Sequence, residues 1–177
     1  MSKFLVIAEK PSVAQSYAKN LSAYKREDGY LEGESCIVSW CLGHLAEYAH
    51  PEEYDPKYEK WQFDDLPILP EAWKLKVSKD KKKQFDVLKG LMTRSDVEYL
   101  VNGCDAGREG ELIFQRVYVL AGCRKPVKRL WISSMEDAAI QKGFQTMKSE
   151  EEYKNLCMAA VCRAQADWLI GMNGTRA

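Results

Sequence analysis

Histidine is scarce in this sequence, with only His44 and His50, and no two of the six cysteines stand in a C-x-x-C spacing. Structural zinc sites take four ligands from these two residue types, usually from closely spaced pairs. We therefore expect no zinc site. We expect the cysteines to be the reduced thiols of a cytoplasmic protein.

Long apolar runs and an excess of charge of one sign are also absent. No apolar segment approaches the length that spans a membrane, and the run at residues 4–8 is too short for the core of a signal peptide. The 26 basic residues balance the 26 acidic ones, so a nucleic acid could bind only to a local basic face. The 177 residues suffice for one hydrophobic core and part of a second domain.

Strand-like and amphipathic helical segments alternate along most of the chain. We expect strands at residues 4–8, 35–40, 73–77, 99–104 and 127–132, and helices at 11–21, 80–92, from 112 and from 136. This alternation predicts right-handed crossovers and a mostly parallel sheet. Residues 48–70, with four prolines, predict an irregular excursion, and residues 150–171 predict one or two helices with no strand after them.

Carboxylates follow two of the predicted strands. Glu9 ends the first strand, and Asp105 opens an acidic turn between the strand at 99–104 and the next helix. Ligands gather outside the carboxyl ends of parallel strands, and neighbouring strands lie about 4.8 Å apart, so the two carboxylates converge if these strands are neighbours. Oxygen ligands without histidine or cysteine favour Mg²⁺. Glu109 and Glu111, in the following turn, could reach that ion directly or through water.

Two charged residues of this turn leave alternatives open. For Glu111 we favour a role in complementing the dipole of the following helix over a role at the metal. Arg108 could form an ion pair with Glu109 or Glu111, or it could hold a phosphate beside the metal with its forked guanidinium. We favour the phosphate, because Gly107 and Gly110 open the backbone around Arg108.

Four segments in order resemble type IA DNA topoisomerases, most closely the bacterial topoisomerase III branch: the first three resemble the family's Toprim domain and the last resembles the segment that follows it. They are Ala-Glu-Lys-Pro-Ser at 8–12, Asp-Ala-Gly-Arg-Glu-Gly-Glu at 105–111, Arg-Leu-Trp-Ile-Ser-Ser at 129–134, and residues 163–176. The resemblance implies an α/β fold. Residues 1–149 would form a Rossmann-like Toprim domain with a mostly parallel sheet flanked by helices. Residues 150–177 would begin an incomplete helical DNA-binding region.

The resemblance implies an enzyme that cleaves, passes and religates single DNA strands with Mg²⁺ and without ATP. Glu9 would be a metal ligand or an acid–base group, Lys10 would donate to the scissile phosphate, and Arg108 would join them in catalysis. Asp105 and Glu109 would hold Mg²⁺. Gly107 departs from the family pattern Asp-x-Asp-x-Glu at the second aspartate, which puts two-metal occupancy in doubt. The attacking tyrosine is expected outside this chain.

The resemblance also implies contacts to single-stranded DNA from Trp61, Trp168 and Arg176, with Arg163 and His44 as further candidates. Tryptophan can stack on a base, and arginine can bind phosphate. Alternatives exist for two of them, because Trp168 could be a core residue and Arg163 could form an ordinary i,i+4 pair with Asp167. The basic run at 79–83 is interpreted as a solvated helix start.

Two other functions compete with a topoisomerase. One is a free-standing Toprim nuclease or primase-like protein, which would not need the segment at 163–176. The other is a non-catalytic DNA- or nucleotide-binding module, which the clustered acids disfavour because bare acids repel phosphate. We expect a bacterial cytoplasmic protein associated with the nucleoid.

Overall fold

The computed structural model describes residues 2–177 and is built on a seven-stranded sheet in the order β2-β3-β4-β1-β7-β8-β9. The strands of this sheet are β1 (Lys3–Ala8), β2 (Lys25–Glu27), β3 (Tyr30–Glu32), β4 (Cys36–Trp40), β7 (Val97–Gly103), β8 (Val127–Arg129) and β9 (Lys148–Ser149). A second sheet pairs β5 (Ala46–Tyr48) with β6 (Leu75–Val77). The helices are α1 (Pro11–Asn20), α2 (Lys82–Thr93), α3 (Arg108–Ala121), α4 (Asp137–Gln145) and α5 (Lys154–Gly174). Short 3₁₀ helices are η1 (Pro51–Glu53), η2 (Pro56–Glu59), η3 (Phe63–Asp65), η4 (Lys79–Lys81) and η5 (Glu150–Tyr153).

The four central strands, β4, β1, β7 and β8, run parallel, whereas β2, β3 and β9 are antiparallel additions at the two edges. The expected mostly parallel sheet is therefore confirmed. In the register of β1 and β7, Ala8 lies opposite Gly103. Both strands consequently end at the same edge of the sheet, which is where their following residues can meet.

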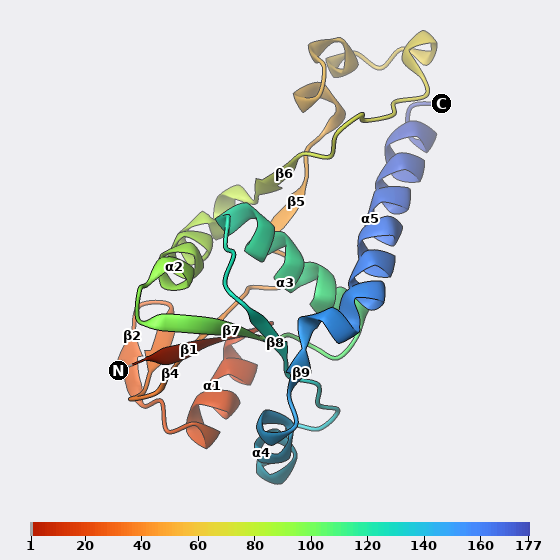
Figure 1. The fold of residues 1–177 in the computed structure, drawn as a ribbon. Helices are drawn as coiled ribbons and strands as arrows, with labels where there is room; N and C mark the ends of the chain where they lie inside the picture. The colour runs from red at the N-terminus through yellow and green to blue at the C-terminus, as the bar shows by residue number, and fades with distance from the viewer. Residues whose placement is uncertain (1) are drawn as a thin grey trace.

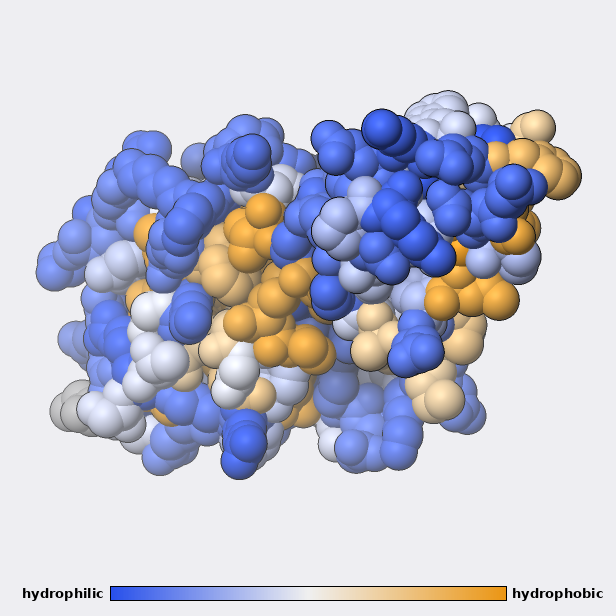
Figure 2. All heavy atoms as spheres, turned by 90° about the horizontal axis from the view of Figure 1, so that it is seen from above, coloured by the Kyte–Doolittle hydropathy of each residue, from blue (hydrophilic) through white to orange (hydrophobic). Residues whose placement is uncertain are grey.

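Helices cover both faces of this sheet (Figure 1). Side chains of a strand alternate between faces, so Leu5 and Ile7 pack with α2 and α3, while Val6 and Ala8 pack on the opposite face with α1 and α4. All four are fully buried. Seen from above, the surface is mainly hydrophilic, with a strip of apolar residues between hydrophilic regions (Figure 2).

The excursion between β5 and β6 leaves the sheet and returns to pack on α5, beside the C-terminus (Figure 1). Ile68 of the excursion and Trp168 of α5 lie in this third apolar cluster. Asn173 fastens the two segments, because its amide accepts from the Ile68 backbone N–H and donates to the Ile68 carbonyl. No helix within residues 2–177 combines the length and apolar character that a membrane crossing requires.

Several element boundaries differ from the expectation. The hairpin of β2 and β3 was not predicted, although Asp28-Gly29 at its turn is a typical hairpin signal. Strand β9 was also missed, and β8 ends at Arg129, near the end of its partner β7. Helix α3 begins at Arg108 instead of residue 112. Glu109 and Glu111 therefore lie in the first helical turn.

Candidate metal and phosphate site

Glu9 and Asp105 meet where β1 and β7 end. The Asp105 backbone N–H donates to Glu9 Oε2 at 3.3 Å, although the two residues are 96 positions apart in the sequence. Glu9 is partly buried and Asp105 is exposed, so both carboxylates remain open to solvent. The two residues thus meet at this edge of the sheet, through the backbone of Asp105 and the carboxylate of Glu9.

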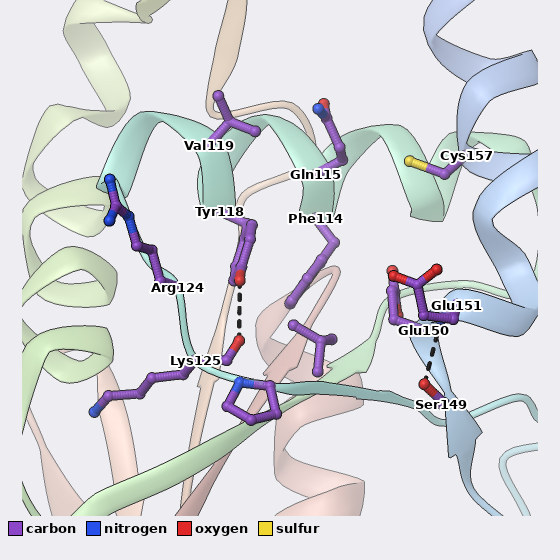
Figure 3. A pocket seen from close by; sticks show the side chains of 12 residues that line it. Phe114, Gln115, Tyr118, Val119, Arg124, Lys125, Ser149, Glu150, Glu151 and Cys157 are labelled. Atoms are coloured by element: carbon purple, nitrogen blue, oxygen red, sulfur yellow. Dashed lines mark hydrogen bonds between the residues drawn. The ribbon is translucent and has the colours of Figure 1, made fainter.

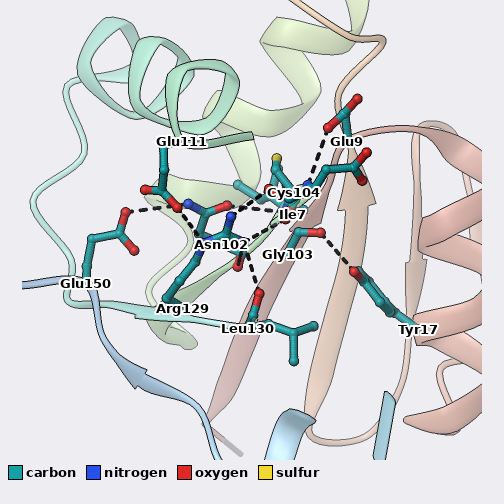
Figure 4. Close-up of polar contacts among 11 residues, drawn as sticks. Ile7, Glu9, Tyr17, Asn102, Gly103, Cys104, Glu111, Arg129, Leu130 and Glu150 are labelled. Atoms are coloured by element: carbon teal, nitrogen blue, oxygen red, sulfur yellow. Dashed lines mark hydrogen bonds and ion pairs between the residues drawn. The ribbon is translucent and has the colours of Figure 1, made fainter. Parts of the chain in front are cut away.

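A buried arginine holds the turn that carries Asp105. Arg129 forms an ion pair with Glu111 at 2.5 Å, and both side chains have no exposed surface. The guanidinium of Arg129 also donates to four backbone carbonyls, those of Asn102, Cys104, Asp105 and Leu130 (Figure 4). Buried donors and acceptors need partners, and here Arg129 satisfies most carbonyls around the end of β7, while the Gly103 carbonyl accepts from the Tyr17 hydroxyl at 2.9 Å. Arg129 therefore fixes the backbone from which the Asp105 carboxylate projects.

The first turn of α3 approaches the same backbone very closely. A Cβ added at Gly110 would lie 2.0 Å from the Asp105 carbonyl oxygen, so only glycine fits there. A Cβ added at Gly107 would meet nothing within 4 Å. The turn thus requires glycine at 110 because of the close approach, and it favours glycine at 107 because of the φ of +158° there.

Glu109, an expected metal ligand, points to a different partner. His44 Nε2 donates to Glu109 Oε2 at 2.8 Å, and Arg116 Nη1 lies 3.4 Å from Nδ1 on the other side of the ring. Within residues 2–177, no three His, Cys, Asp or Glu side chains come together as a metal-binding group. The structure therefore brings Glu9 and Asp105 together but leaves Glu109 with His44.

The donor set of Glu9 and Asp105 fits Mg²⁺. This ion is commonly bound through one or two carboxylates while it keeps several waters. Two accessible carboxylates meet that requirement, and the thiol of the neighbouring Cys104 is buried. They do not make a cage that would hold the ion tightly.

A cavity of about 240 Å³ lies next to this turn, between α3 and α5. Three arginines line it, Arg108, Arg116 and Arg163, together with His44, Glu109 and Asp167 among others. Arg116 is buried, and its Nε has no hydrogen-bond partner in the part of the chain that the structure describes. Guanidinium groups suit phosphate oxygens, so the cavity has the chemistry of a phosphate site.

Arg108 and Arg163 line this cavity in different ways. Arg108 is exposed, and the acids that could have paired with it contact His44 and Arg129 instead. Arg163 lies 3.7 Å from Asp167 in the i,i+4 pair that was one of the alternatives, and both side chains stay exposed. Arg108 therefore keeps its donors open toward the cavity.

Trp61 and Arg176 form a contact at the far end of the molecule. The Arg176 guanidinium lies 5.0 Å from the centroid of the Trp61 ring, and Trp61 is 63% exposed. Both residues line a cavity of about 610 Å³. The Arg176 side chain is only 7% exposed, and its Nε and Nη1 have no partner among the described residues. Arg176 Nη2 lies 3.9 Å from Glu52 Oε2. A cation with unpaired donors beside an exposed indole suits a phosphate and a base.

Trp168 occupies the core, unlike the expected DNA contact. Its ring packs edge-on against Tyr54 and Trp73, and its Nε1 donates to the Ala49 carbonyl at 3.0 Å. The residue is 8% exposed. Because neighbouring rings cover it, Trp168 has no free face on which a base could stack.

The sequence interpretation missed the functions of three residues in or near the site. Glu111 lies in the first turn of α3, where it can complement the helix dipole, but its buried ion pair with Arg129 was not predicted, and neither Arg129 nor Arg116 received a role. The sequence does contain a signal for these three residues, because each is a charged residue within or beside an apolar stretch. An arginine there needs a buried partner, which only the folded structure identifies.

Comparison with known proteins agrees with this fold. Residues 4–135 match the family model described as Toprim domain. DNA topoisomerase 3 of Bacillus subtilis (strain 168) is 51% identical over all 177 residues, which correspond to 24% of that protein, and DNA topoisomerase 3 of Bacillus anthracis gives the same figures. The chain thus spans about a quarter of the length of these relatives.

A solved structure shares the fold. Full-length topoisomerase I from Thermotoga maritima, in a monoclinic crystal form, superposes with a TM-score of 0.53 at 21% identity, over 85% of this chain and 22% of that one. At this identity the likeness concerns the fold alone. The family match covers most of the chain, from β1 through the acidic turn to β8, and this chain belongs to the Toprim domain family.

Proposed function

We propose that this chain forms the Toprim part of a type IA DNA topoisomerase of the topoisomerase 3 kind. Such an enzyme cleaves one DNA strand, passes another strand through the break and religates it without ATP. The observation that carries the proposal is the meeting of Glu9 and Asp105 beside the arginine-lined cavity. In this proposal residues 1–149 are the Toprim domain, and residues 150–177 begin a helical DNA-binding region of a bacterial cytoplasmic enzyme.

Glu9 and Asp105 would hold Mg²⁺. When bound, this ion would offset the negative charge of a nearby phosphodiester and of the carboxylates themselves. Glu109 is not needed for this role, because it is held by His44. The site would bind the ion weakly in the absence of DNA, since only two carboxylates contribute.

Residues around the carboxylates would bind and orient the scissile phosphate. Lys10 is exposed at the start of α1, directly after Glu9, and would donate to a phosphate oxygen. Arg108 would do the same from α3. Glu9 would exchange a proton with the leaving oxygen during cleavage and religation. The attacking tyrosine would come from a segment outside these residues.

The DNA strand would also contact the excursion. Trp61 would stack on an unpaired base, while Arg176 would bind a phosphate with its open donors. His44 and Arg163 would face the same strand from the cavity between α3 and α5. Binding that depends on such cations should weaken steeply with salt.

A free-standing Toprim nuclease is the competing proposal. The family match ends at residue 135, but the likeness to the Bacillus proteins runs on through α5 to the last residue. Helix α5 packs on α3 and carries Arg163 into the cavity. A free nuclease would have no need of this helix, so its presence favours the topoisomerase.

Calorimetric titration of the chain with Mg²⁺ tests the metal assignment. Asp105→Asn should weaken Mg²⁺ binding at least tenfold, since it removes one of two charged ligands. Glu109→Gln is the matched control, because it neutralises an acid of the same turn and should leave the affinity within twofold. Equal binding by wild type and Asp105→Asn, both folded, would remove the metal site from the proposal.

A further inference from the structure

Two glutamates that the proposed function does not use lie together under the sheet edge. Glu111 of α3 is fully buried, with Oε1 bound to Arg129. Glu150 of η5 receives a long hydrogen bond from Asn102 Nδ2 to its Oε1, at 3.5 Å. The remaining oxygen of each, Glu111 Oε2 and Glu150 Oε2, is buried and has no donor among residues 2–177.

Two buried carboxylates at one place need more than one compensating charge. Arg129 is the cation of the cluster and is bound to Glu111 (Figure 4). A second carboxylate left charged beside Glu111 would be both desolvated and repelled. Neutralising Glu150 removes both costs.

The other groups around Glu150 do not supply the missing charge. Arg124 and Lys125 line the cavity beside Glu150 but lie on its opposite side, and Lys125 Nζ donates to the Arg94 carbonyl (Figure 3). Lys148 of β9 is exposed and paired with Glu152, and Glu151 points its exposed side chain to solvent. Burial first, and then the charges of Glu111 and Glu150, raises the pKa of Cys157 to about 11, so the α5 thiol is neutral. Tyr118 of α3 donates to the Lys125 carbonyl.

We propose that Glu150 keeps a proton until the pH reaches neutrality and donates it to Glu111 Oε2, so that the two side chains share one proton. A single O–H then satisfies both oxygens that otherwise lack a donor. Burial, followed by the negative charge of Glu111, raises the pKa of Glu150 to about 7, which agrees with this arrangement.

The shared proton fastens the start of α5 to the sheet. Glu150 lies in η5 directly before α5, whereas Glu111 and Arg129 hold the backbone of Asp105. Loss of the proton would place two repelling charges at this junction. A cavity of about 540 Å³ opens beside Glu150, between α3, β8 and α5, and gives the ionised side chain room to turn away from Glu111 (Figure 3).

The pH dependence has a definite sign. The folded state binds this proton more tightly than the unfolded chain does. The proton therefore contributes its full stabilisation at pH values below 4.5, the ordinary pKa of glutamate. It is lost as the pH rises through about 7, and it is absent above that. The wild-type melting temperature should therefore fall between pH 5 and 8.

Carbon-13 NMR of the side-chain carboxyl groups tests the proposal directly, on the chain without metal or DNA. The Glu150 carboxyl should titrate with a midpoint near 7, whereas Glu151 should titrate with an ordinary midpoint below 5. A Glu150 midpoint below 5 would overturn the proposal.

Thermal unfolding of a matched pair of variants adds a second readout. Glu150→Gln mimics the protonated form, so its melting temperature should lose the part of the pH 5–8 decline that the shared proton causes. Glu151→Gln changes the next residue of the same 3₁₀ helix and should keep the wild-type slope. Identical slopes in wild type and Glu150→Gln would contradict the shared proton. Neither measurement depends on the proposed topoisomerase activity.

Discussion

Arg116 lies against His44, with Nη1 of the guanidinium 3.4 Å from Nδ1 of the imidazole. Arginine can only donate hydrogen bonds, so Nδ1 of His44 must be the acceptor. The ring proton then sits on Nε2, which donates to Glu109 Oε2 at 2.8 Å. Arg116 thereby selects one tautomer of a histidine that lines the cavity beside Asp105.

Nitrogen-15 NMR of the imidazole should show this selection. In wild type His44 should be the Nε2–H tautomer, and Arg116→Met should give a mixture of both tautomers because the donor to Nδ1 is gone. Arg108→Met is the control, since Arg108 lines the same cavity without contacting His44 and should leave the tautomer unchanged. A wild-type ring protonated at Nδ1 alone would refute the assignment.

Two helical glycines should respond to alanine in opposite ways. Gly110→Ala should destabilise the fold by about 2 kcal/mol or more, because the added Cβ meets the Asp105 carbonyl and backbone must move. Gly90→Ala in α2 should stabilise it by ~0.5–1 kcal/mol, since nothing lies within 4 Å of the new atom and alanine favours the helix. Urea denaturation measures both. A stable Gly110→Ala variant would mean that the turn has more freedom than its close packing indicates.

A side chain at position 107 would have open space around it, but the φ of +158° at Gly107 is one that residues other than glycine rarely adopt. Gly107→Asp should lower the stability of the fold for this reason, while in the folded protein the additional charge near Asp105 should tighten Mg²⁺ binding about tenfold, or about 1.4 kcal/mol. Gly107→Asn has the same size without the charge and should not reproduce the gain. Calorimetry compares the three proteins, and equal affinities in folded variants would show that position 107 faces away from the ion.

Substitution of Trp61 and of Trp168, the two tryptophans expected to contact DNA, should affect different properties of the protein. Trp61→Ala should weaken binding of a single-stranded oligonucleotide by ~1–3 kcal/mol, the value of one stacked base, with the melting temperature unchanged. Trp168→Ala should lower the free energy of unfolding by about 3–5 kcal/mol, because it empties the cluster between α5 and the excursion. Fluorescence anisotropy and urea denaturation distinguish the two effects. A DNA-binding loss without destabilisation in Trp168→Ala would contradict its place in the core.

The meeting of Glu9 and Asp105 could be predicted because it depends on local signals. Each acid follows a short apolar run, and parallel strands bring such ends to one edge. The pair of Glu111 and Arg129 could not be predicted in this way. It depends on how α3 is rotated over β8, and therefore on the close approach at Gly110. The position of Trp168 could not be predicted either. A tryptophan in a helical segment gives the same sequence pattern whether its ring packs in the core or binds a ligand.

Because Glu9 and Asp105 are far apart in the sequence, Mg²⁺ binding reports when the strands that carry them come together during refolding. Contacts between residues distant in the sequence form slowly, because the entropy of closing a long loop is lost before the contacts stabilise the fold. The two ligands come together only once β1 has paired with β7, whereas α2, α3 and the β2–β3 hairpin are local in sequence. In a stopped-flow experiment, Mg²⁺-dependent signals should consequently appear after most of the helical circular dichroism has returned.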